Sequence, residues 1–378
     1  MTALSGHILT PGGWLAGTLQ FDAHGRIAAV EGAAVEEAQV RASALPMLIP
    51  GFVDLHVHGG GGQDIMQGGA ASQHVAALHA RYGTTAMLAT TMTAPFEDLR
   101  QAFTGLAPSL VAPRGEGARV LGVHLEGPYI NEGKLGAQPA YARPLQSDEL
   151  AALHALAAIR LVTLAPEVPG NMQAIDALVA AGLRVQIGHS LASYEQSAEA
   201  LARGATGFTH LFNAMSPLHH REPGAVGAAL AHAQFAEIIP DLIHVHAGAI
   251  RVALRAIPHL YCVTDSTAAA GMPDGDYRLG RHMVTKCLGG VRLPDGTLAG
   301  STLTMDHAFR NLVLSLGLSL QEASLRTSTF AADHMGVLDR GRLVPRAWAD
   351  VLVLGHDLQL QAIYTEGSRL EPAHPEQP

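Results

Sequence analysis

Two features of this 378-residue sequence predict an α/β fold, namely a (β/α)8 TIM barrel with a small discontinuous β-sandwich domain built from both termini. From residue 47 onward, a short apolar run ending in polar residues alternates eight times with a segment of helical spacing. Runs rich in Val, Ile, Leu and Thr are typical of parallel strands buried on both faces. Eight such βα units predict a closed barrel, and the two ends of the chain have a different, β-rich pattern.

The expected elements of the barrel follow one another along the chain. The strands are expected at 47–58, 84–92, 120–127, 159–167, 184–190, 207–215, 237–246 and 259–267. Helical spacing is found in segments 72–82, 148–158, 172–181, 193–203 and 249–256. Ser72, Ser147 and Ser193 stand at or next to the start of a helical segment, so we predict that their hydroxyl groups cap the helices.

The two ends of the chain predict a second, smaller domain. Residues 1–46 contain short strands separated by turn signals at Pro11-Gly12-Gly13 and His24-Gly25, and residues 341–367 follow a similar pattern. We therefore expect a barrel domain at 47–340, with 1–46 and 341–378 as the two parts of the β domain. The Pro- and Glu-rich tail after Ser368 is expected to fray.

Composition excludes several classes of protein. A net charge of −9 and an aromatic content of 5% argue against a nucleic-acid partner, because basic faces and stacking surfaces are scarce. The two cysteines, Cys262 and Cys287, are too few for a disulfide framework. We find no signal-peptide pattern at residues 1–9 and no apolar stretch long enough to span a membrane. We therefore expect a cytoplasmic globular protein with no membrane partner.

Metal-ligand residue types gather where the expected strands end, which is where the catalytic groups of a TIM barrel project. Strand alternation places the two histidines of the first strand on the same side. One histidine among 21 is more often structural than a ligand. Ligand-type residues at five strand ends are much harder to explain by packing, because buried polar groups need partners. These residues are His56, His58, Glu126, His189, His210 and Asp265.

This residue set predicts a catalytic divalent metal that keeps one position open for water. A bound metal of this kind lowers the pKa of water to about 7 and so supplies hydroxide at neutral pH. The reaction also needs a base, and Asp265 at the end of the last strand is our candidate. Zinc is the expected metal, as one or two ions, and iron, manganese or cobalt would suit the same ligands.

The order of these residues resembles the amidohydrolase superfamily. Many of its members use a carbamylated lysine on the fourth strand, but neither Lys134 nor Lys286 ends an expected strand, and Glu126 takes the bridging position. With the segment "GVHLEGPYIN", this variation is similar to the N-acetylglucosamine-6-phosphate deacetylase family. The similarity continues in order and spacing through nearly the whole chain, in "QIGHS", "THLFNAM", "REPG", "VTDSTAAAG" and "GTLAGSTLTM".

The resemblance implies a role for each matching residue. It implies Glu126, His189 and His210 as metal ligands and Asp265 as the acid/base. Arg221, from the partner subunit of a homodimer, and His244 would supply positive charge to a sugar phosphate, as forked arginine bonds to phosphate allow. The remaining substrate contacts that it implies are Ala137, Gln138, Asn213, Ala214, Leu298 and Gly300.

Two positions depart from the pattern of some relatives. Where they carry Gln-x-Asn and bind one metal, this chain has His56 and His58, which with Glu126 offer a second metal site. Where relatives often have a histidine that contacts the substrate, this chain has Gln138, whose amide donates and accepts hydrogen bonds but carries no charge. Gln138 therefore leaves the choice between gluco- and galacto-substrates open.

The implied activity is hydrolysis of the acetamide of N-acetylglucosamine 6-phosphate to glucosamine 6-phosphate and acetate, with Asp265 moving the proton. One alternative is a related amidohydrolase that acts on N-acetylgalactosamine 6-phosphate, an N-acyl amino acid or a cyclic amide. Another is a catalytically inactive barrel that serves as a scaffold. Retention of all six ligand-type residues argues against the scaffold, because inactive barrels typically lose some of them.

Overall fold

The expected barrel is present in the computed structural model, which describes residues 1–112, 115 and 117–373. Its strands are β5 (Phe52–Val57), β8 (Thr84–Thr91), β9 (Arg119–Glu126), β10 (Ile159–Leu164), β11 (Arg184–Ile187), β12 (Gly207–Phe208), β13 (Phe235–Ile238) and β14 (His259–Cys262). The first six of these strands, β5, β8, β9, β10, β11 and β12, form one parallel sheet in chain order, and β13 pairs with β14. Backbone contacts join the two sheets at both edges: for example, Leu211 N donates to Glu237 O at 2.9 Å, and Val57 forms a bridge with Ser266.

The first expected strand, 47–58, is two strands that belong to different sheets. β4 (Met47–Pro50) pairs with strands from both ends of the chain, and only β5 enters the barrel. The chain passes between the sheets at Gly51, where a Cβ atom would lie 2.2 Å from Thr85 Oγ1. An apolar run cannot reveal this division, because both strands are buried throughout.

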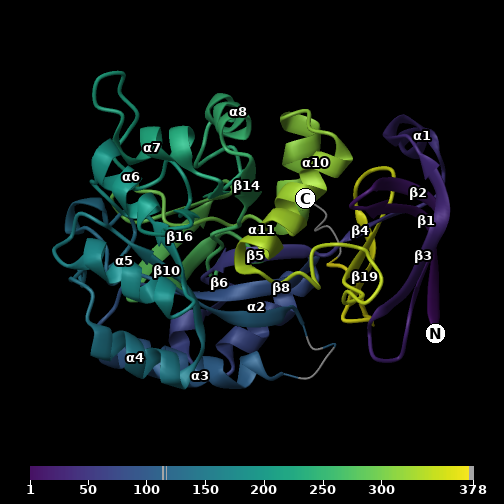
Figure 1. Ribbon diagram of the computed structural model, residues 1–378. Helices are drawn as coiled ribbons and strands as arrows, with labels where there is room; N and C mark the ends of the chain where they lie inside the picture. Colours follow the sequence, from purple (N-terminus) through teal and green to yellow (C-terminus); the bar gives the residue numbers. More distant parts are fainter. Residues whose placement is uncertain (113–114, 116, 374–378) are drawn as a thin grey trace.

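The two termini meet in one seven-stranded sheet at one end of the molecule, where the purple and yellow segments lie side by side in Figure 1. This arrangement confirms that both ends of the chain build one β-sheet domain, in which the strands form a single seven-stranded sheet. The strand order is β20-β19-β18-β4-β1-β2-β3. The remaining bounds are β1 (Thr2–Thr10), β2 (Gly13–Phe21), β3 (Ile27–Val35), β18 (Val351–Leu354), β19 (Leu360–Thr365) and β20 (Ser368–Leu370), with helix α1 (Glu37–Ala42) after β3.

The tail that we expected to fray after Ser368 instead begins with β20, which pairs with β19. Ala373 N then donates to Arg81 O at 2.8 Å. The prediction of fraying is therefore wrong for the first residues of the tail. Its last five residues, 374–378, lie outside the described part of the chain.

Helices connect the barrel strands. The α-helices are α2 (Ala71–Ala80), α3 (Phe96–Leu110), α4 (Ser147–Leu156), α5 (Asn171–Ala180), α6 (Tyr194–Ala202), α7 (Gly224–His232), α8 (Ala247–Ala256), α9 (Met305–Arg310), α10 (Leu320–Ser324) and α11 (Phe330–Met335). Short 3₁₀ turns (Ile65–Gln67, Glu132–Lys134) and π-helical turns (Asn311–Ser315, Leu325–Thr329) complete the set. Within the described ranges, no helix has the length and apolar character needed to cross a membrane.

Only one of the three predicted serine caps is confirmed. Ser193 accepts a hydrogen bond from Gln196 N and caps α6. Ser147 is instead the first residue of α4, and Ser72 lies inside α2, buried with its hydroxyl 2.6 Å from that of Ser109. Both predictions were wrong by one or two residues, an error typical of helix boundaries read from sequence.

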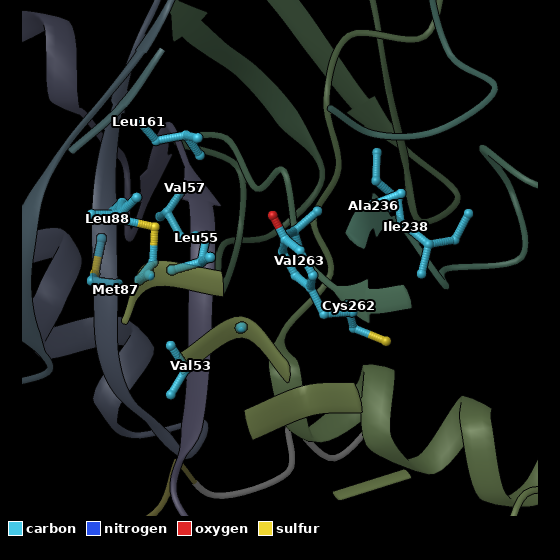
Figure 2. Close-up of a cluster of buried hydrophobic side chains, with 14 of the residues drawn as sticks. Val53, Leu55, Val57, Met87, Leu88, Leu161, Ala236, Ile238, Cys262 and Val263 are labelled. Carbon is cyan, nitrogen blue, oxygen red and sulfur yellow. The ribbon is translucent and has the colours of Figure 1, made fainter. Parts of the chain in front are cut away.

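Strand alternation divides the side chains of β5 between two surroundings. Val53, Leu55 and Val57 join the main hydrophobic core, where Figure 2 shows them with side chains of β8, β10, β13 and β14. Burial of each such side chain contributes about 1.5–3 kcal/mol. The intervening Asp54 and His56 are also fully buried and make polar contacts. The strand therefore packs the barrel with one set of residues and supplies chemistry with the other.

A three-stranded antiparallel sheet lies between β14 and α9, and the sequence did not predict it. It comprises β15 (Gly275–Leu279), β16 (His282–Cys287) and β17 (Gly290–Arg292), which we call the flap. Leu279, Val284 and Val291 pack with Met92, which follows β8 in the barrel. This contact holds the flap near the carboxyl ends of the strands. A smaller ladder, β6 (Gly59–Gly60) with β7 (Gln63–Asp64), follows β5.

Candidate metal centre and active site

A cavity of about 350 Å³ opens at the carboxyl ends of the barrel strands and brings most of the predicted site residues together. Predicted residues that line it are His58, Glu126, Ala137, Gln138, His189, His210, Asn213, Ala214, His244, Asp265, Leu298 and Gly300. His56 is fully buried and does not line the cavity, although its Nε2 atom lies 3.1 Å from His58 Nε2. Arg221 is exposed and does not line it either; its Nη1 atom lies 2.7 Å from His220 Nε2.

The Glu126 carboxylate lies at the centre of the histidine cluster. Its Oε1 atom is 3.1 Å from His189 Nε2 and 2.9 Å from His210 Nε2. Its Oε2 atom is 3.1 Å from His58 Nε2 and 3.4 Å from His56 Nε2. Glu126 ends β9 and is 1% exposed, so each of its oxygen atoms faces two imidazoles in a site with little water.

The ring orientations of two histidines fit a cation at this centre. His189 Nδ1 lies 2.8 Å from Lys134 O, and His56 Nδ1 lies 2.9 Å from Glu237 Oε2. A carbonyl or carboxylate oxygen can only accept, so each Nδ1 atom carries a proton and each ring turns its Nε2 atom toward the carboxylates. Imidazole nitrogens and carboxylate oxygens that converge on one point are the ligand set of a divalent metal.

Three groups of side chains have suitably spaced donor atoms within the described residues, but they are not equivalent. Glu126, His189 and His210 form one group, and His56, His58 and Asp265 form the second. The third group contains His124, His56 and Glu237. Both His124 ring nitrogens are already engaged, with Leu55 O at 3.1 Å and Thr163 Oγ1 at 2.7 Å. Only the first two groups can hold a divalent metal through free lone pairs.

Asp265 is positioned beside the second group. Its Oδ1 atom lies 3.3 Å from His58 Nε2, and its backbone N–H donates to His56 O at 2.9 Å. Burial raises the pKa of Asp265, but the neighbouring His56 and His58 lower it by more than burial raises it, so the net shift is downward. Asp265 is therefore a carboxylate at neutral pH and can accept a proton.

The backbone is strained where the site is built. His189, His210 and Asp265 all have positive φ angles, of 49°, 30° and 50°. Such angles are uncommon for residues other than glycine and persist where the surrounding structure enforces them. Gly300 lies close by, and a Cβ atom there would lie 2.6 Å from Thr267 Cγ2. This close packing defines the positions of the site residues.

One end of the cavity carries groups suited to an anion. His244 Nδ1 lies 2.6 Å from Asp241 Oδ2, which leaves Nε2 free to meet a ligand. Burial lowers the pKa of His244, but Asp241 raises it more, so the charged form is favoured. Asn213 Nδ2 donates to His210 O at 3.1 Å, which places the amide next to a histidine of the metal group.

Gln138 lies in the cavity wall, but both polar atoms of its side chain already have protein partners. Its Nε2 atom donates to Glu126 Oε2 at 2.6 Å, and its Oε1 atom accepts from Thr93 N at 2.7 Å. The substrate contact that the sequence predicted for Gln138 remains a prediction.

Several residues of the site were not predicted. Glu237 is fully buried and accepts from His56 Nδ1 and from His210 N, the latter at 3.1 Å. A charged residue inside the apolar run of β13 was the available signal. Lys134, one of two lysines in the chain, lines the cavity, as do Met92 and Thr297. Nothing in their local sequence distinguishes Met92 and Thr297, because distant segments bring them to the cavity.

The barrel with its carboxylate–histidine centre defines a hydrolase of the amidohydrolase class. The description "amidohydrolase family" also belongs to the family model that matches residues 47–370, and the chain belongs to that family. It is 39% identical to the N-acetylglucosamine-6-phosphate deacetylase of Vibrio furnissii, over 92% of this chain and 88% of the relative. It is 40% identical to the N-acetylgalactosamine-6-phosphate deacetylase of Escherichia coli O157:H7, over 95% and 96%.

Solved structures agree with the sequence comparison. The N-acetylglucosamine-6-phosphate deacetylase of Thermotoga maritima matches with a TM-score of 0.90 and 30% identity, over 98% of this chain and all of that chain (100%). A mutant of the Mycobacterium smegmatis deacetylase in complex with N-acetyl-D-glucosamine-6-phosphate matches with a TM-score of 0.88 and 34% identity, over 97% and 98%. Within the amidohydrolases, the chain therefore belongs to the N-acetylglucosamine-6-phosphate deacetylase family.

Proposed function

We propose that this enzyme hydrolyses the acetamide of N-acetyl-D-glucosamine 6-phosphate to D-glucosamine 6-phosphate and acetate. One observation carries the proposal: a single cavity joins the Glu126 centre and the Asp265 carboxylate to an anion-binding end at His244. An acetamide to be cleaved and a phosphate to be held need these two kinds of group in one place. The names of the relatives support the same substrate.

The proposed metal ligands are Glu126, His189 and His210, with His56 and His58 offering a second position next to Glu126 Oε2. Zinc suits histidine and carboxylate ligands best, and iron, manganese or cobalt would also bind there. A bound divalent ion supplies a Lewis acid and lowers the pKa of bound water to about 7. The ring orientation of His189 and His56, with Nδ1 bonded to the protein and Nε2 turned toward the carboxylates, supports these assignments.

Asp265 is the proposed proton carrier. Its carboxylate accepts a proton from the attacking water as the water oxygen bonds to the acetamide carbon. The C–N bond then breaks, and Asp265 returns the proton to the departing nitrogen, which leaves as the amine of glucosamine 6-phosphate. The depressed pKa of the carboxyl supports the first step, because the group must begin unprotonated.

The phosphate end is proposed to use His244, Asn213 and the backbone of Ala214, with Ala137, Leu298 and Gly300 against the sugar. Arg221 of the partner subunit would add charge, which requires a homodimer. The exposed position of Arg221, outside the cavity of its own subunit, supports a role in trans.

Two broader assignments belong to the same proposal. The enzyme would act in the cytoplasm, where phosphorylated sugars are retained. Its catalytic domain would be 47–340, with 1–46 and 341–378 forming the small β domain. Within 47–340, the strand β4 pairs with the terminal strands, and the chain enters the barrel after Gly51.

A second candidate substrate is N-acetylgalactosamine 6-phosphate. A relative with 40% identity over 95% of this chain is named for that activity. The two substrates differ only in the configuration of one hydroxyl group, so the same metal and phosphate contacts would serve both.

A free-amine assay on metal-replete enzyme tests the proposal, with both phosphosugars and unphosphorylated N-acetylglucosamine as substrates. We expect turnover of N-acetylglucosamine 6-phosphate and a large loss without the phosphate. Arg221→Ala should raise KM for the phosphosugar and leave turnover of the unphosphorylated sugar unchanged. Faster turnover of the galacto-substrate would select the second candidate, and turnover of none would overturn both.

A further inference from the structure

Gln138 lies in the loop between β9 and α4, within hydrogen-bond distance of the Glu126 carboxylate. It is 6% exposed, and its backbone N–H donates to Leu135 O at 2.8 Å, which closes a turn. The same loop supplies Lys134 O, which holds the His189 ring at 2.8 Å. One loop therefore contacts two residues of the first metal group.

The orientation of the Gln138 amide is determined by the backbone beside it. The two ends of an amide are normally hard to tell apart and are assigned from their partners. Here Thr93 N is a backbone donor, 2.7 Å from Oε1, so the oxygen must face it. The NH2 group then faces Glu126 Oε2 at 2.6 Å, a short bond to a charged acceptor.

We propose that Gln138 is a positioning residue for Glu126: its amide donates to Oε2 and thereby directs Oε1 to the ion held with His189 and His210. The inference rests on the proposed metal-dependent function and deepens it. Partners that orient a ligating carboxylate are known to affect metal affinity strongly.

The proposal has a second consequence for metal stoichiometry. Oε2 also faces His58 Nε2 at 3.1 Å and His56 Nε2 at 3.4 Å, so it is the oxygen that a second ion would use. An N–H donor on this oxygen competes with a cation for its lone pairs. Gln138 therefore favours the ion at Glu126, His189 and His210 over the ion at His56 and His58.

Zinc titration of metal-stripped protein against a chromophoric chelator, without substrate, tests this role. Gln138→Leu keeps similar volume but cannot donate, and we expect the affinity of the first ion to fall about 10- to 100-fold. Gln138→Glu keeps the acceptor for Thr93 N and replaces the donor by a carboxylate. We expect this variant to bind the second ion more tightly than the wild-type protein. It also provides the test if Gln138→Leu does not fold.

Kinetics of the metal-saturated variants separate positioning from substrate contact. For Gln138→Leu we expect kcat to fall with little change in KM, because positioning acts through Glu126. Asn213→Ala, at a proposed substrate contact, should instead raise KM and leave zinc affinity unchanged. If Gln138→Leu gives the Asn213→Ala pattern, or neither Gln138 variant alters zinc binding, the proposal is overturned. The titration needs no substrate, so failure to turn over any sugar would count against the proposed function alone.

Discussion

Among single residues, Asp265 has the role that is simplest to isolate. Asp265→Asn keeps the size of the side chain but removes the atom that accepts the proton. We expect kcat to fall by at least about 100-fold, the usual size of an acid–base contribution. Circular dichroism and the binding of the ion at Glu126, His189 and His210 should be unchanged, and steady-state kinetics provide the measurement. A variant that kept more than about one hundredth of the wild-type kcat would exclude Asp265 as the essential base.

Glu237 lies beneath the site and accepts hydrogen bonds from two buried nitrogen donors, His56 Nδ1 and His210 N, and a longer one of 3.4 Å from the Tyr261 hydroxyl. Glu237→Leu leaves both donors unpaired, and each unpaired buried group costs about 1–3 kcal/mol. We therefore expect the free energy of unfolding of metal-free protein to fall by about 2–6 kcal/mol. Glu237→Gln, whose amide oxygen can accept the same two bonds, is the matched control and should lose much less. Equal losses in urea unfolding would contradict this role.

The sequence predicted the metal-ligand residues and the proton carrier of the site, but not the residues that hydrogen-bond to them and orient them. His56, His58 and Asp265 could be chosen because strand alternation and strand ends restrict where a side chain points. Glu237 and Gln138 act through partners far away in the sequence, on β5 and beside β8, and no local pattern records those contacts. The role of Arg221 depends on a second subunit, which one sequence does not describe.

At the scale of elements, two serines at helix starts show what local sequence can predict. Ser193 and Ser147 are both exposed, but only Ser193 accepts the capping hydrogen bond. Ser193→Ala should therefore lower the free energy of unfolding by about 1 kcal/mol. Ser147→Ala is the control and should change it by less than about 0.5 kcal/mol. The same loss in both variants, measured by chemical denaturation, would mean that the cap is not the cause.

Some strands could likewise be predicted from local sequence, and others could not. β8, β10 and β11 begin at the expected residues because apolar β-branched runs specify buried parallel strands. The flap was missed because its short strands alternate buried and exposed residues and bury only a few apolar side chains against the barrel. Its position depends on that tertiary contact, which no single segment encodes.

For the molecule as a whole, ion pairs centred on the buried Glu366 carboxylate join the terminal sheet to the barrel. Arg119, at the start of β9, donates to Glu366, in the turn between β19 and β20, at 2.7 and 3.0 Å. Arg340 binds the same Glu366 and also Asp350, at 2.6 Å from Asp350 Oδ2. Removing one partner of a buried pair leaves an uncompensated charge. The position of the β domain on the barrel therefore depends on these few residues as well as on shared apolar surface.

The stability of the whole protein should also depend on pH through His334, a buried residue that does not line the cavity. Its Nδ1 atom lies 3.0 Å from Tyr261 Oη, and Nε2 lies 2.9 Å from Thr206 Oγ1. Burial, with a smaller effect of Arg184, lowers the pKa of His334 to about 3. The unfolded chain has an ordinary histidine pKa of about 6.5, so only the unfolded state binds the proton between these two values.

The contribution of His334 to the free energy of unfolding is therefore fully present above about pH 6.5 and is lost as the pH falls toward 3. Between pH 7.5 and 5.5 the expected loss is about 1.4 kcal/mol, from one proton over roughly one pH unit below the unfolded pKa. His334→Gln keeps a polar side chain that does not titrate, so its unfolding free energy should fall by about 1.4 kcal/mol less over the same interval. Urea unfolding of both proteins at the two pH values measures this difference, in which the shared titration of other groups cancels. An identical pH dependence for both proteins would contradict the prediction, because it would mean that the pKa of His334 is not lowered in the folded state.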